Sequence, residues 1–485
     1  MKTRVSSAVA AILDAALRGE LTETQAQQLY AYGPEAVTLV LLTITRHVAE
    51  QDAEIATPQA PDAGPSLSTP SGMVPVYAKP NATRRRRRPG ARKGHPGARR
   101  GQPTRIDRQE VHRLPRCPQC NGRLQRCRRV RSRLVEDIPQ DIQPVVTEHL
   151  IHRDYCPRCK KHVEPVVPDA LPRATLGHHV VALSSWFHYG LGITIDQIVE
   201  ILSCHLQTRL TPGGLIQAWQ RLAEVLTTWY EEIARQAREA ARLHADETGW
   251  RVNGQTYWLW CFATAHVCYY MIDRCRGSPA LKRFFIDAFA GVLITDFWAP
   301  YEAVCAEDRQ YCLVHLLREL ETVDLRNDSS EWKAFARRLR RLLRAAIRLR
   351  QRADFAPGKY QSRVDRLNRR LARMAAAEPV DADTRRLTKR LRRYAEYLLT
   401  FLDYADVPYE NNFAERQIRP AVIIRKNSLS NRSERGASMQ AVLMSVYRTL
   451  KLRGLNPTRT IAAALRTYVA TGKLPPLPDP AIAHG

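Results

Sequence analysis

The sequence predicts a multidomain α+β protein in which an α/β sheet domain is interrupted by an all-helical insertion. A chain of 485 residues exceeds the usual size of a single domain. After residue 241, β-rich runs alternate with helical runs, until about 80 basic, helical residues separate two parts of that pattern. Because so long a loop is rare inside a compact domain, these residues are expected to form an inserted subdomain.

The charge of the chain is unusual and unevenly distributed. Lys and Arg number 75 against 48 Asp and Glu, which gives a formal net charge of +27. Arg84–Arg133 holds 19 basic and 2 acidic residues, and Lys333–Arg393 holds 21 basic and 5 acidic residues. Two basic modules are therefore attached to a slightly acidic body, and a polyanionic partner is expected, either nucleic acid or an anionic membrane surface.

The first segment, residues 1–56, is predicted to be helical. Apolar residues recur there at helical spacing, as in Leu13, Ala16 and Leu17. Asp14 interrupts the short apolar core, and the pattern is typical of an amphipathic helix rather than a signal peptide. No run of about 18 uncharged apolar residues follows, so no membrane span is expected. The eleven cysteines are an odd number in a long chain, which favours a reducing cytoplasm over a disulfide framework.

Residues 57–110 are predicted to be a disordered Pro-rich linker followed by a basic arm. The arm cannot bury a core, so it is either a solvated tail or a DNA-backbone contact. Under the second interpretation the candidate contacts are Arg84, Arg85, Arg86, Arg87, Arg88, Arg92, Lys93, His95, Arg99 and Arg100.

Residues 111–168 contain two CxxC pairs among short β-prone stretches, which predicts a zinc ribbon. Four thiolates suit one tetrahedral zinc ion with a structural role. The spacer of 35 residues is long and requires an extended arm. Cys127 is left outside the site. The four predicted ligands are Cys117, Cys120, Cys156 and Cys159.

Residues 169–241 are predicted to be helical. A short turn separates two of the helices, and Thr211 followed by Pro212 makes a good helix start. The pattern is similar to a DNA-binding helix-turn-helix, and helical packing without DNA contact is an equal alternative.

The sheet domain begins with three β-rich runs joined by tight turns, one of them at Asn253-Gly254. A helix, a fourth run, another helix and a fifth strand follow, which is the strand order of an RNase H-like sheet. The segments expected are 242–319 for the first part of this domain, 320–400 for the helical basic insertion, 401–450 for the second part and 451–485 for a C-terminal helical tail.

Three carboxylates carry the predicted chemistry. Asp246 ends the first β-run, Asp296 ends the fourth, and Glu415 lies on a predicted helix. In an RNase H-like sheet the first and fourth strands are neighbours and a later helix crosses beside them, so these acids should converge. Phosphoryl transfer by two divalent ions needs such a cluster, and carboxylate oxygens suit Mg²⁺ or Mn²⁺. Glu247 and Asp273 are competitors, but Glu247 should point to the other strand face and Asp273 ends a different strand.

Two further groups of residues accompany the triad. Cys312 and His315 form a Cys-x-x-His pair on the predicted fifth strand, which is either a polar spot beside the sheet or a histidine that shapes the site. Positive and amide side chains suited to contact the DNA backbone surround Glu415, and a separate set of arginines forms one stripe on the insertion. They are Asn411, Asn412, Arg416, Arg419, Arg425 and Lys426 near Glu415, and Arg337, Arg341, Arg344 and Arg348 on the insertion.

These strings, taken in order, resemble the insertion-sequence-66 family of transposases over nearly the whole chain. The matching strings are KGHPG, CPQC, CPRC, HADETGW, ITDFWAPY, ENNFAERQIRP, RKN and SERGA. The resemblance implies a DDE transposase with the RNase H fold, with Asp246, Asp296 and Glu415 as its metal-binding triad. Cys312 and His315 match a Cys/Asp-x-x-His signature of several DDE groups. The family also implies terminal inverted repeats as substrate and accessory proteins of the same element.

The expected function is therefore metal-dependent cleavage and strand transfer of double-stranded DNA, at transposon ends and target. The expected cofactors are two Mg²⁺ or Mn²⁺ ions and a structural Zn²⁺. His315 is expected to have a catalytic role beside the triad. Because two DNA ends must be brought together, a homodimer or larger assembly on DNA is expected, in the bacterial cytoplasm and without a membrane partner. The alternatives are a catalytically silent zinc-ribbon DNA-binding regulator and a structure-specific nuclease.

Overall fold

The computed structural model describes residues 7–17, 21–38, 40–43, 45, 103, 105–125, 131–139, 141–352, 356–429 and 431–481. Contacts divide the chain into two compact units, the first of which is Met1–Thr69 with Val76–Ala78. Most of the predicted linker and all the arm residues proposed to contact DNA, from Arg84 to Arg100, lie outside the described residues.

The first unit is helical where it is described. Helix α1 spans Ser7–Leu17 and helix α2 spans Glu23–Ala31. Thr22 and Gln25 form a capping box at the start of α2, in which each side chain accepts the backbone N–H of the other residue. Val9, Ile12, Leu29 and Val40 form its buried core. The helical character predicted for this segment is confirmed.

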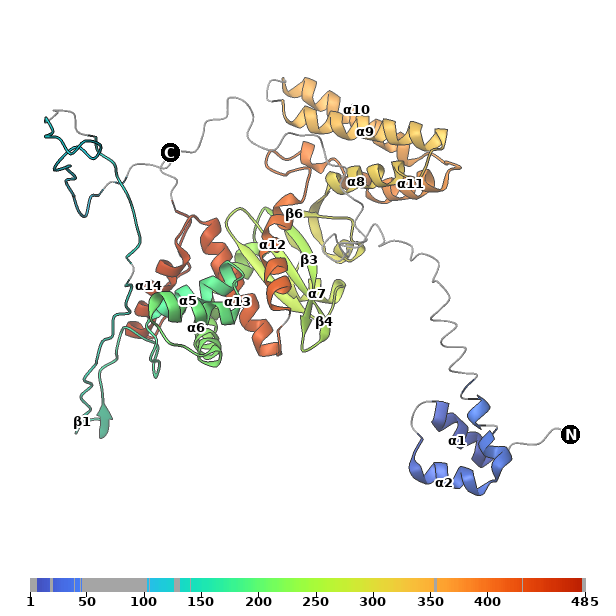
Figure 1. Ribbon diagram of the computed structural model, residues 1–485. Helices are drawn as coiled ribbons and strands as arrows, with labels where there is room; N and C mark the ends of the chain where they lie inside the picture. The colour runs from blue at the N-terminus through green and yellow to red at the C-terminus, as the bar shows by residue number, and fades with distance from the viewer. Residues whose placement is uncertain are drawn as a thin grey trace. The chain divides into compact units, whose positions relative to one another are not determined.

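The second unit is built on a five-stranded mixed sheet with the strand order β5-β4-β3-β6-β7 (Figure 1). The first three strands in sequence pair antiparallel, whereas β6 runs parallel to both β3 and β7. The first and fourth strands are therefore neighbours, as predicted. The strands are β3 (Arg242–Val252), β4 (Gln255–Ala263), β5 (Cys268–Asp273), β6 (Phe289–Thr295) and β7 (Ala306–Tyr311).

The predicted hairpin turn between β3 and β4 is confirmed. Asn253 and Gly254 both have positive φ, of 48° and 75°. Two consecutive left-handed residues favour Asn-Gly because other residues are strained there.

Long helices complete the core around the sheet. Helix α6 (Pro212–Arg238) and helix α13 (Glu434–Leu452) pack on each other and on β5. Thr211 caps α6 by accepting the N–H of Gly214, as the Thr-Pro start predicts. Trp219 and Trp229 of α6 are almost fully buried in the core that includes the sheet.

The segment 169–241 is therefore part of the sheet domain rather than a separate DNA-binding module. Its helices α4 (His178–Ser185), α5 (Ile195–Leu206) and α6 share one core with the sheet, α13 and helix α14 (Pro457–Thr471). The shared core shows that these helices pack on the sheet, whereas DNA contact by their exposed faces stays a prediction.

The helical insertion begins directly after β7. It consists of α8 (Leu313–Asp324), α9 (Ser330–Arg350), α10 (Pro357–Ala375) and α11 (Ala382–Tyr394), drawn in yellow and orange in Figure 1. These helices bury a second core of their own, which also includes Val292, Ile294 and Tyr311 from the sheet. The chain then returns to the sheet domain through α12 (Asn412–Ser428).

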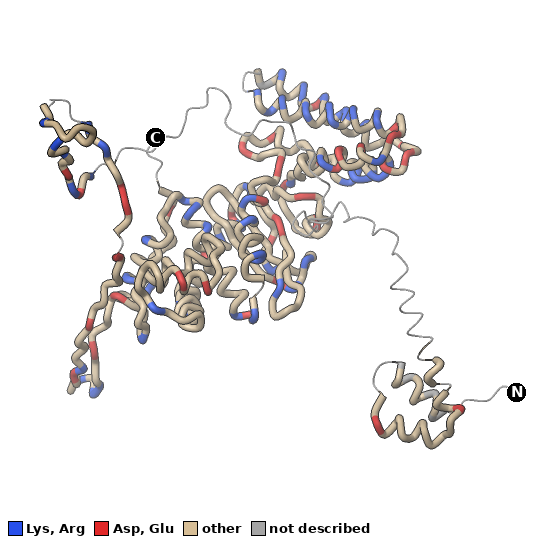
Figure 2. The backbone as a smooth tube through the Cα atoms, in the orientation of Figure 1, with Lys and Arg blue, Asp and Glu red and all other residues tan. Residues whose placement is uncertain are grey.

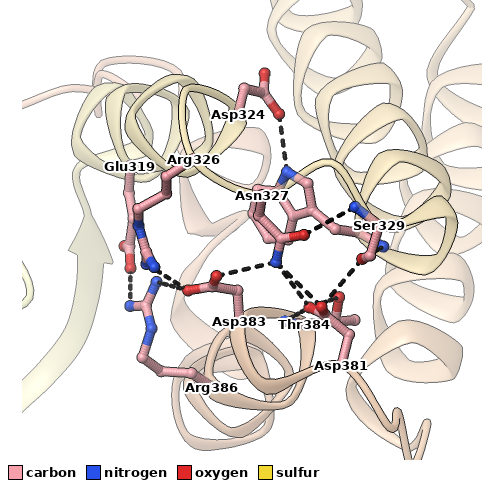
Figure 3. A network of polar contacts seen from close by, with 10 residues as sticks. Glu319, Asp324, Arg326, Asn327, Ser329, Asp381, Asp383, Thr384 and Arg386 are labelled. Atoms are coloured by element: carbon pink, nitrogen blue, oxygen red, sulfur yellow. Dashed lines mark hydrogen bonds and ion pairs between the residues drawn. The ribbon is translucent and has the colours of Figure 1, made fainter.

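A polar network joins the turn between α8 and α9 to the start of α11 (Figure 3). The Asn327 amide donates 3.0 Å hydrogen bonds to both Asp381 and Asp383. Arg326 forms an ion pair with Asp383 at 2.5 Å, and Ser329 Oγ donates to Asp381 at 3.0 Å. The network fixes the angle between the first and last helices of the insertion.

No described helix of the chain is long and apolar enough to cross a membrane.

Candidate active site

Two aspartates stand side by side on neighbouring parallel strands. Asp246 lies in β3, and Asp296 follows the last residue of β6 directly. His244 and Ile294 are register partners, so the residues two positions further along each strand reach the same level. Both aspartates are half-buried, and Asp296 Oδ1 accepts the backbone N–H of Trp298 at 2.9 Å.

Helix α12 fixes the third carboxylate over the same face of β3. At one end, His244 Nδ1 donates to Asn411 Oδ1 at 2.9 Å. Further along the helix, the Arg425 guanidinium donates to Thr248 Oγ1 at 3.0 Å. Because strand residues two apart share a face, Asp246 lies between the two strand residues that α12 contacts. Glu415, in the first turn of α12, is therefore carried to the side of the sheet that holds Asp246.

The three carboxylates affect one another's ionisation. Burial raises the pKa of Asp246 well above its usual value, and the negative charges of Glu247, Asp296 and Glu415 add to that rise. Burial also raises the pKa of Asp296, although the nearby His315 opposes the rise. The site therefore concentrates negative charge that a cation would stabilise.

The Glu415 carboxylate lies near the side chains of His315 and Arg318. Its Oε1 is 3.6 Å from Nε2 of His315 and 3.8 Å from a guanidinium nitrogen of Arg318. Within the described part of the chain, no three His, Cys, Asp or Glu side chains are close enough together to hold one metal ion. In this structure Glu415 therefore contacts His315 and Arg318 rather than forming one cluster with the two aspartates.

The Cys-x-x-His pair lies at the junction of strand and helix, not on the strand as predicted. Strand β7 ends at Tyr311, Cys312 is the N-cap of α8, and His315 lies in its first turn. The buried Cys312 Sγ accepts the N–H of Asn411 at 3.2 Å, and burial raises the pKa of its thiol to about 11. Cys312 therefore packs as a neutral thiol, whereas His315 faces the site beside Glu415.

Glu247 points away from the triad face, as the strand alternation predicts, and joins a second buried network. Its Oε2 accepts the Tyr301 hydroxyl at 2.7 Å, and its Oε1 forms an ion pair with Arg276 at 3.1 Å. Burial and the charge of Asp296 raise the pKa of Glu247 to about 7. The Glu247 carboxyl group therefore interacts electrostatically with Asp246 and Asp296 from the opposite face of β3.

Arg276 is a supporting residue that the sequence did not reveal. Its guanidinium stands over the rings of Trp258 and Trp298, at 4.4 and 3.7 Å from their centroids. The backbone N–H of Trp298 donates to Asp296, and the ring of the same residue contacts Arg276. Trp298 therefore links the Arg276–Glu247 pair to the end of β6, where Asp296 lies. The aromatic run after Asp296, FWAPY, is part of the family pattern but does not by itself indicate a partner for Arg276.

Asp273, the other competing acid, has a structural role at the outer strand of the sheet. It ends β5, where Arg283 Nε donates to its Oδ2 at 2.7 Å. Its Oδ1 accepts the N–H of Cys275, also at 2.7 Å. The side chain therefore holds the turn that leads into α7 (Ser278–Phe284).

The donor set predicted around Glu415 divides into internal and exposed members. Asn411 is only 1% exposed and uses its amide for His244 and the carbonyl of Ala245, so its predicted DNA contact was wrong. Arg425 is half-buried and one of its guanidinium nitrogens donates to Thr248 and Gly249 inside the domain, so DNA contact through the rest of its guanidinium stays a prediction. The remaining members are accessible to a ligand, with Asn412 half-buried and Arg416, Arg419 and Lys426 exposed. The predicted stripe on α9 is also exposed, at Arg337, Arg341, Arg344 and Arg348.

The four predicted zinc ligands form two separate pairs. Strands β1 (Asp154–Cys156) and β2 (Lys161–Val163) pair antiparallel, with the second CxxC at their turn. In each pair the backbone N–H of the later cysteine binds the thiol of the earlier one and lowers its pKa, for Cys117 through Cys120 and for Cys156 through Cys159. Each turn therefore favours a thiolate, but the described residues do not gather both pairs around one point.

Comparison with known proteins gives one family and several uncharacterized relatives. Residues 173–439, more than half of the chain, match the Transposase IS66 family. Uncharacterized protein y4hP of Sinorhizobium fredii is 22% identical over 75% of this chain and 72% of its own length. Uncharacterized protein y4jD of the same organism is 23% identical, over 73% and 75%. A third, y4qI, is 25% identical, and that match spans about half the length of each protein, 50% in both cases.

Proposed function

The chain belongs to the IS66 transposase family, and from this premise we propose that it cuts DNA at transposon ends and joins the freed 3′-hydroxyl to target DNA. The observation that supports the proposal is the placement of Asp246 and Asp296 on two adjacent parallel strands, with Glu415 on the helix α12 that packs against the first of them. Under this proposal the sheet is RNase H-like and the three acids form a DDE triad. The protein works in the cytoplasm, where DNA is accessible.

The three carboxylates are proposed to hold two divalent cations, Mg²⁺ or Mn²⁺. The donor set fits hard cations because it consists of carboxylate oxygens whose mutual repulsion already raises the pKa of Asp246. Two such ions supply the charge that activates the attacking water or 3′-hydroxyl and stabilises the leaving 3′-oxygen. His315 and Arg318 hold Glu415 aside until then, and afterwards are free to contact phosphate.

DNA contact outside the triad is proposed for three regions. The basic arm and the zinc ribbon would engage terminal inverted repeats, and the α9 stripe with the exposed residues of α12 would hold flanking or target DNA. Synapsis of two ends requires at least two copies of the chain, so a homodimer or larger assembly on DNA is proposed. Accessory proteins of the same element remain further proposed partners.

A structural zinc ion is proposed for the four cysteines of the ribbon. Both CxxC turns present thiols whose pKa is lowered by backbone N–H groups, the arrangement that a thiolate-bound metal needs. Metal sites of this kind are rarely preformed, so bringing the two pairs together is the folding step that the ion would supply.

The decisive experiment replaces Asp296 by Asn and follows labelled transposon ends with Mg²⁺. Cleavage and joining should be lost, while DNA binding in a gel shift is retained, because only the metal-binding charge is removed. Asp273→Asn is the matched control, since it removes a competing carboxylate at another strand end. Cleavage that survives Asp296→Asn, or is lost equally in Asp273→Asn, would contradict the proposal.

The same assay separates the rival functions. Hydrolysis of the ends by the wild type without any joined product would favour a structure-specific nuclease. Binding without any hydrolysis would favour a catalytically silent zinc-ribbon regulator.

A further inference from the structure

The basic residues of the insertion fall into two groups that differ in their partners. One group is neutralised internally and shapes the subdomain. Arg386 and Arg390 both pair with the buried Glu319, and Arg393 pairs with Glu302 at 2.8 Å. These residues, like Arg326 in Figure 3, bind helices to one another and are committed to the fold.

The second group lies on α9 and α10, where positive charge greatly exceeds negative charge. Residues 330–375 contain 15 basic and 3 acidic residues, and Figure 2 shows the blue segments along both helices. One of these acids, Glu331, already accepts the N–H groups of Val380 and Asp381. The excess positive charge of the hairpin is therefore not neutralised within it.

Arginines of the second group converge on a groove between the two helices. The groove has a volume of about 290 Å³ and is lined by arginines from both sides. Among the described residues, no acidic partner is present for Arg348, Arg366 or Arg370. The lining arginines are Arg348 and Arg352 on the α9 side and Arg363, Arg366 and Arg370 on α10.

The α10 side of this groove carries a second stripe of basic residues, which was not among the sequence-based predictions. Arg363, Arg366, Arg370 and Arg373 recur at spacings of three and four, which places them on one helix face. Leu371 is buried in the insertion core, and Leu367, buried in the same core, also lines the groove beside the arginines. The α9 stripe and the α10 stripe therefore run side by side along two neighbouring helices.

We propose that this groove is a clamp for the phosphate backbone of DNA. The proposal rests on the proposed transposase function and gives the α10 arginines a part in it. Arg348, Arg366 and Arg370, for which the described residues supply no acidic partner, repel one another, and an anionic ligand relieves that repulsion. Guanidinium forks match phosphate oxygens in two-point contacts.

The positive charge continues beyond the groove along the α9 stripe, which favours an extended polyanion over a single small anion. Arg337 to Arg348 spans about 16 Å of helix, which matches roughly five phosphates of one DNA strand. None of the lining residues is Asn or Gln, the side chains that read adenine by paired hydrogen bonds. Arginine can also read guanine, so the proposal commits the groove to phosphate contact without sequence preference, and binding to two different duplexes tests that commitment.

The test uses the full-length protein and the variant Arg366→Gln/Arg370→Gln. Affinity for a transposon end and for an unrelated duplex should fall by the same factor, on the order of tenfold, and the slope of log K against log salt should decrease by about two. Arg366→Lys/Arg370→Lys should restore most of the slope, because it keeps the charges. Circular dichroism checks that each variant is folded.

Arg385→Gln/Lys389→Gln is the matched control, because it removes two exposed charges from α11, outside the groove. If the groove variant binds DNA with the same affinity and salt slope as this control, the clamp is refuted. A loss of affinity confined to the transposon end would also overturn it, because the groove would then read sequence. Failure of the proposed function is a different result, in which the wild type binds DNA but neither cuts nor joins it.

Discussion

Replacing Glu247 by Gln should make the protein more stable above neutral pH and change it little in acid. Glu247 is 2% exposed, and its pKa is about 7 in the folded protein against 4.5 for the unperturbed group. Between these values the folded state binds a proton that the unfolded state has lost, so stability falls as the pH rises. Above pH 7 the folded protein must hold a buried, ionised carboxylate.

The size of the effect follows from the difference in pKa. A change of this size corresponds to about 3 kcal/mol of differential interaction between the two protonation states. Gln imitates the protonated form and does not ionise. The unfolding free energy of Glu247→Gln minus that of the wild type should therefore grow by about 2–3 kcal/mol between pH 5 and pH 8.

Urea unfolding followed by tryptophan fluorescence, at several pH values and with a chelator present, measures this difference. Glu200→Gln is the control, since it removes an exposed carboxylate from α5. If the wild type and Glu247→Gln keep a constant difference across the pH range, the buried-carboxyl explanation is refuted. A growing difference in the opposite direction would show that ionised Glu247 stabilises the fold through Arg276.

Three other changes test separate parts of the structure. Gly291→Ala should destabilise the sheet domain by about 1–3 kcal/mol, because its Cβ would lie 2.6 Å from the carbonyl oxygen of Ala240; the urea midpoint measures this. Asn327→Ala should destabilise the insertion by about 1–3 kcal/mol, because Asp381 and Asp383 each lose a donor; thermal melts followed by circular dichroism would detect it. Cys156→Ser should abolish stoichiometric zinc in metal analysis, whereas equal zinc in variant and wild type would contradict the ribbon site.

The sheet and its triad were predictable because they depend on local patterns. Alternating apolar runs and the Asn-Gly turn define the first hairpin, and the strand order then places Asp246 beside Asp296. Glu247 was assigned to the opposite face by alternation alone, and the structure bears this out. The helix that carries Glu415 was equally clear.

The parts that were missed depend on contacts between distant segments. Nothing local distinguishes Arg425, which is satisfied inside the domain, from Arg416, which is exposed. The buried partners of Glu247 lie 29 and 54 residues away in sequence, at Arg276 and Tyr301. The apolar face of α6 could serve a DNA-binding module or a shared core, and only the packing of α13 against it decides the choice.

The position of the insertion also determines when, during synthesis of the chain, the proposed triad becomes complete. Glu415 follows the whole insertion, whereas both aspartates precede it, so more than a hundred residues are synthesised between the second and third carboxylates. At usual translation rates this takes on the order of ten seconds. During that time the nascent chain also lacks α13, which covers β5. Under the proposed function, an unfinished or prematurely terminated chain therefore lacks Glu415 and with it the ability to cut DNA.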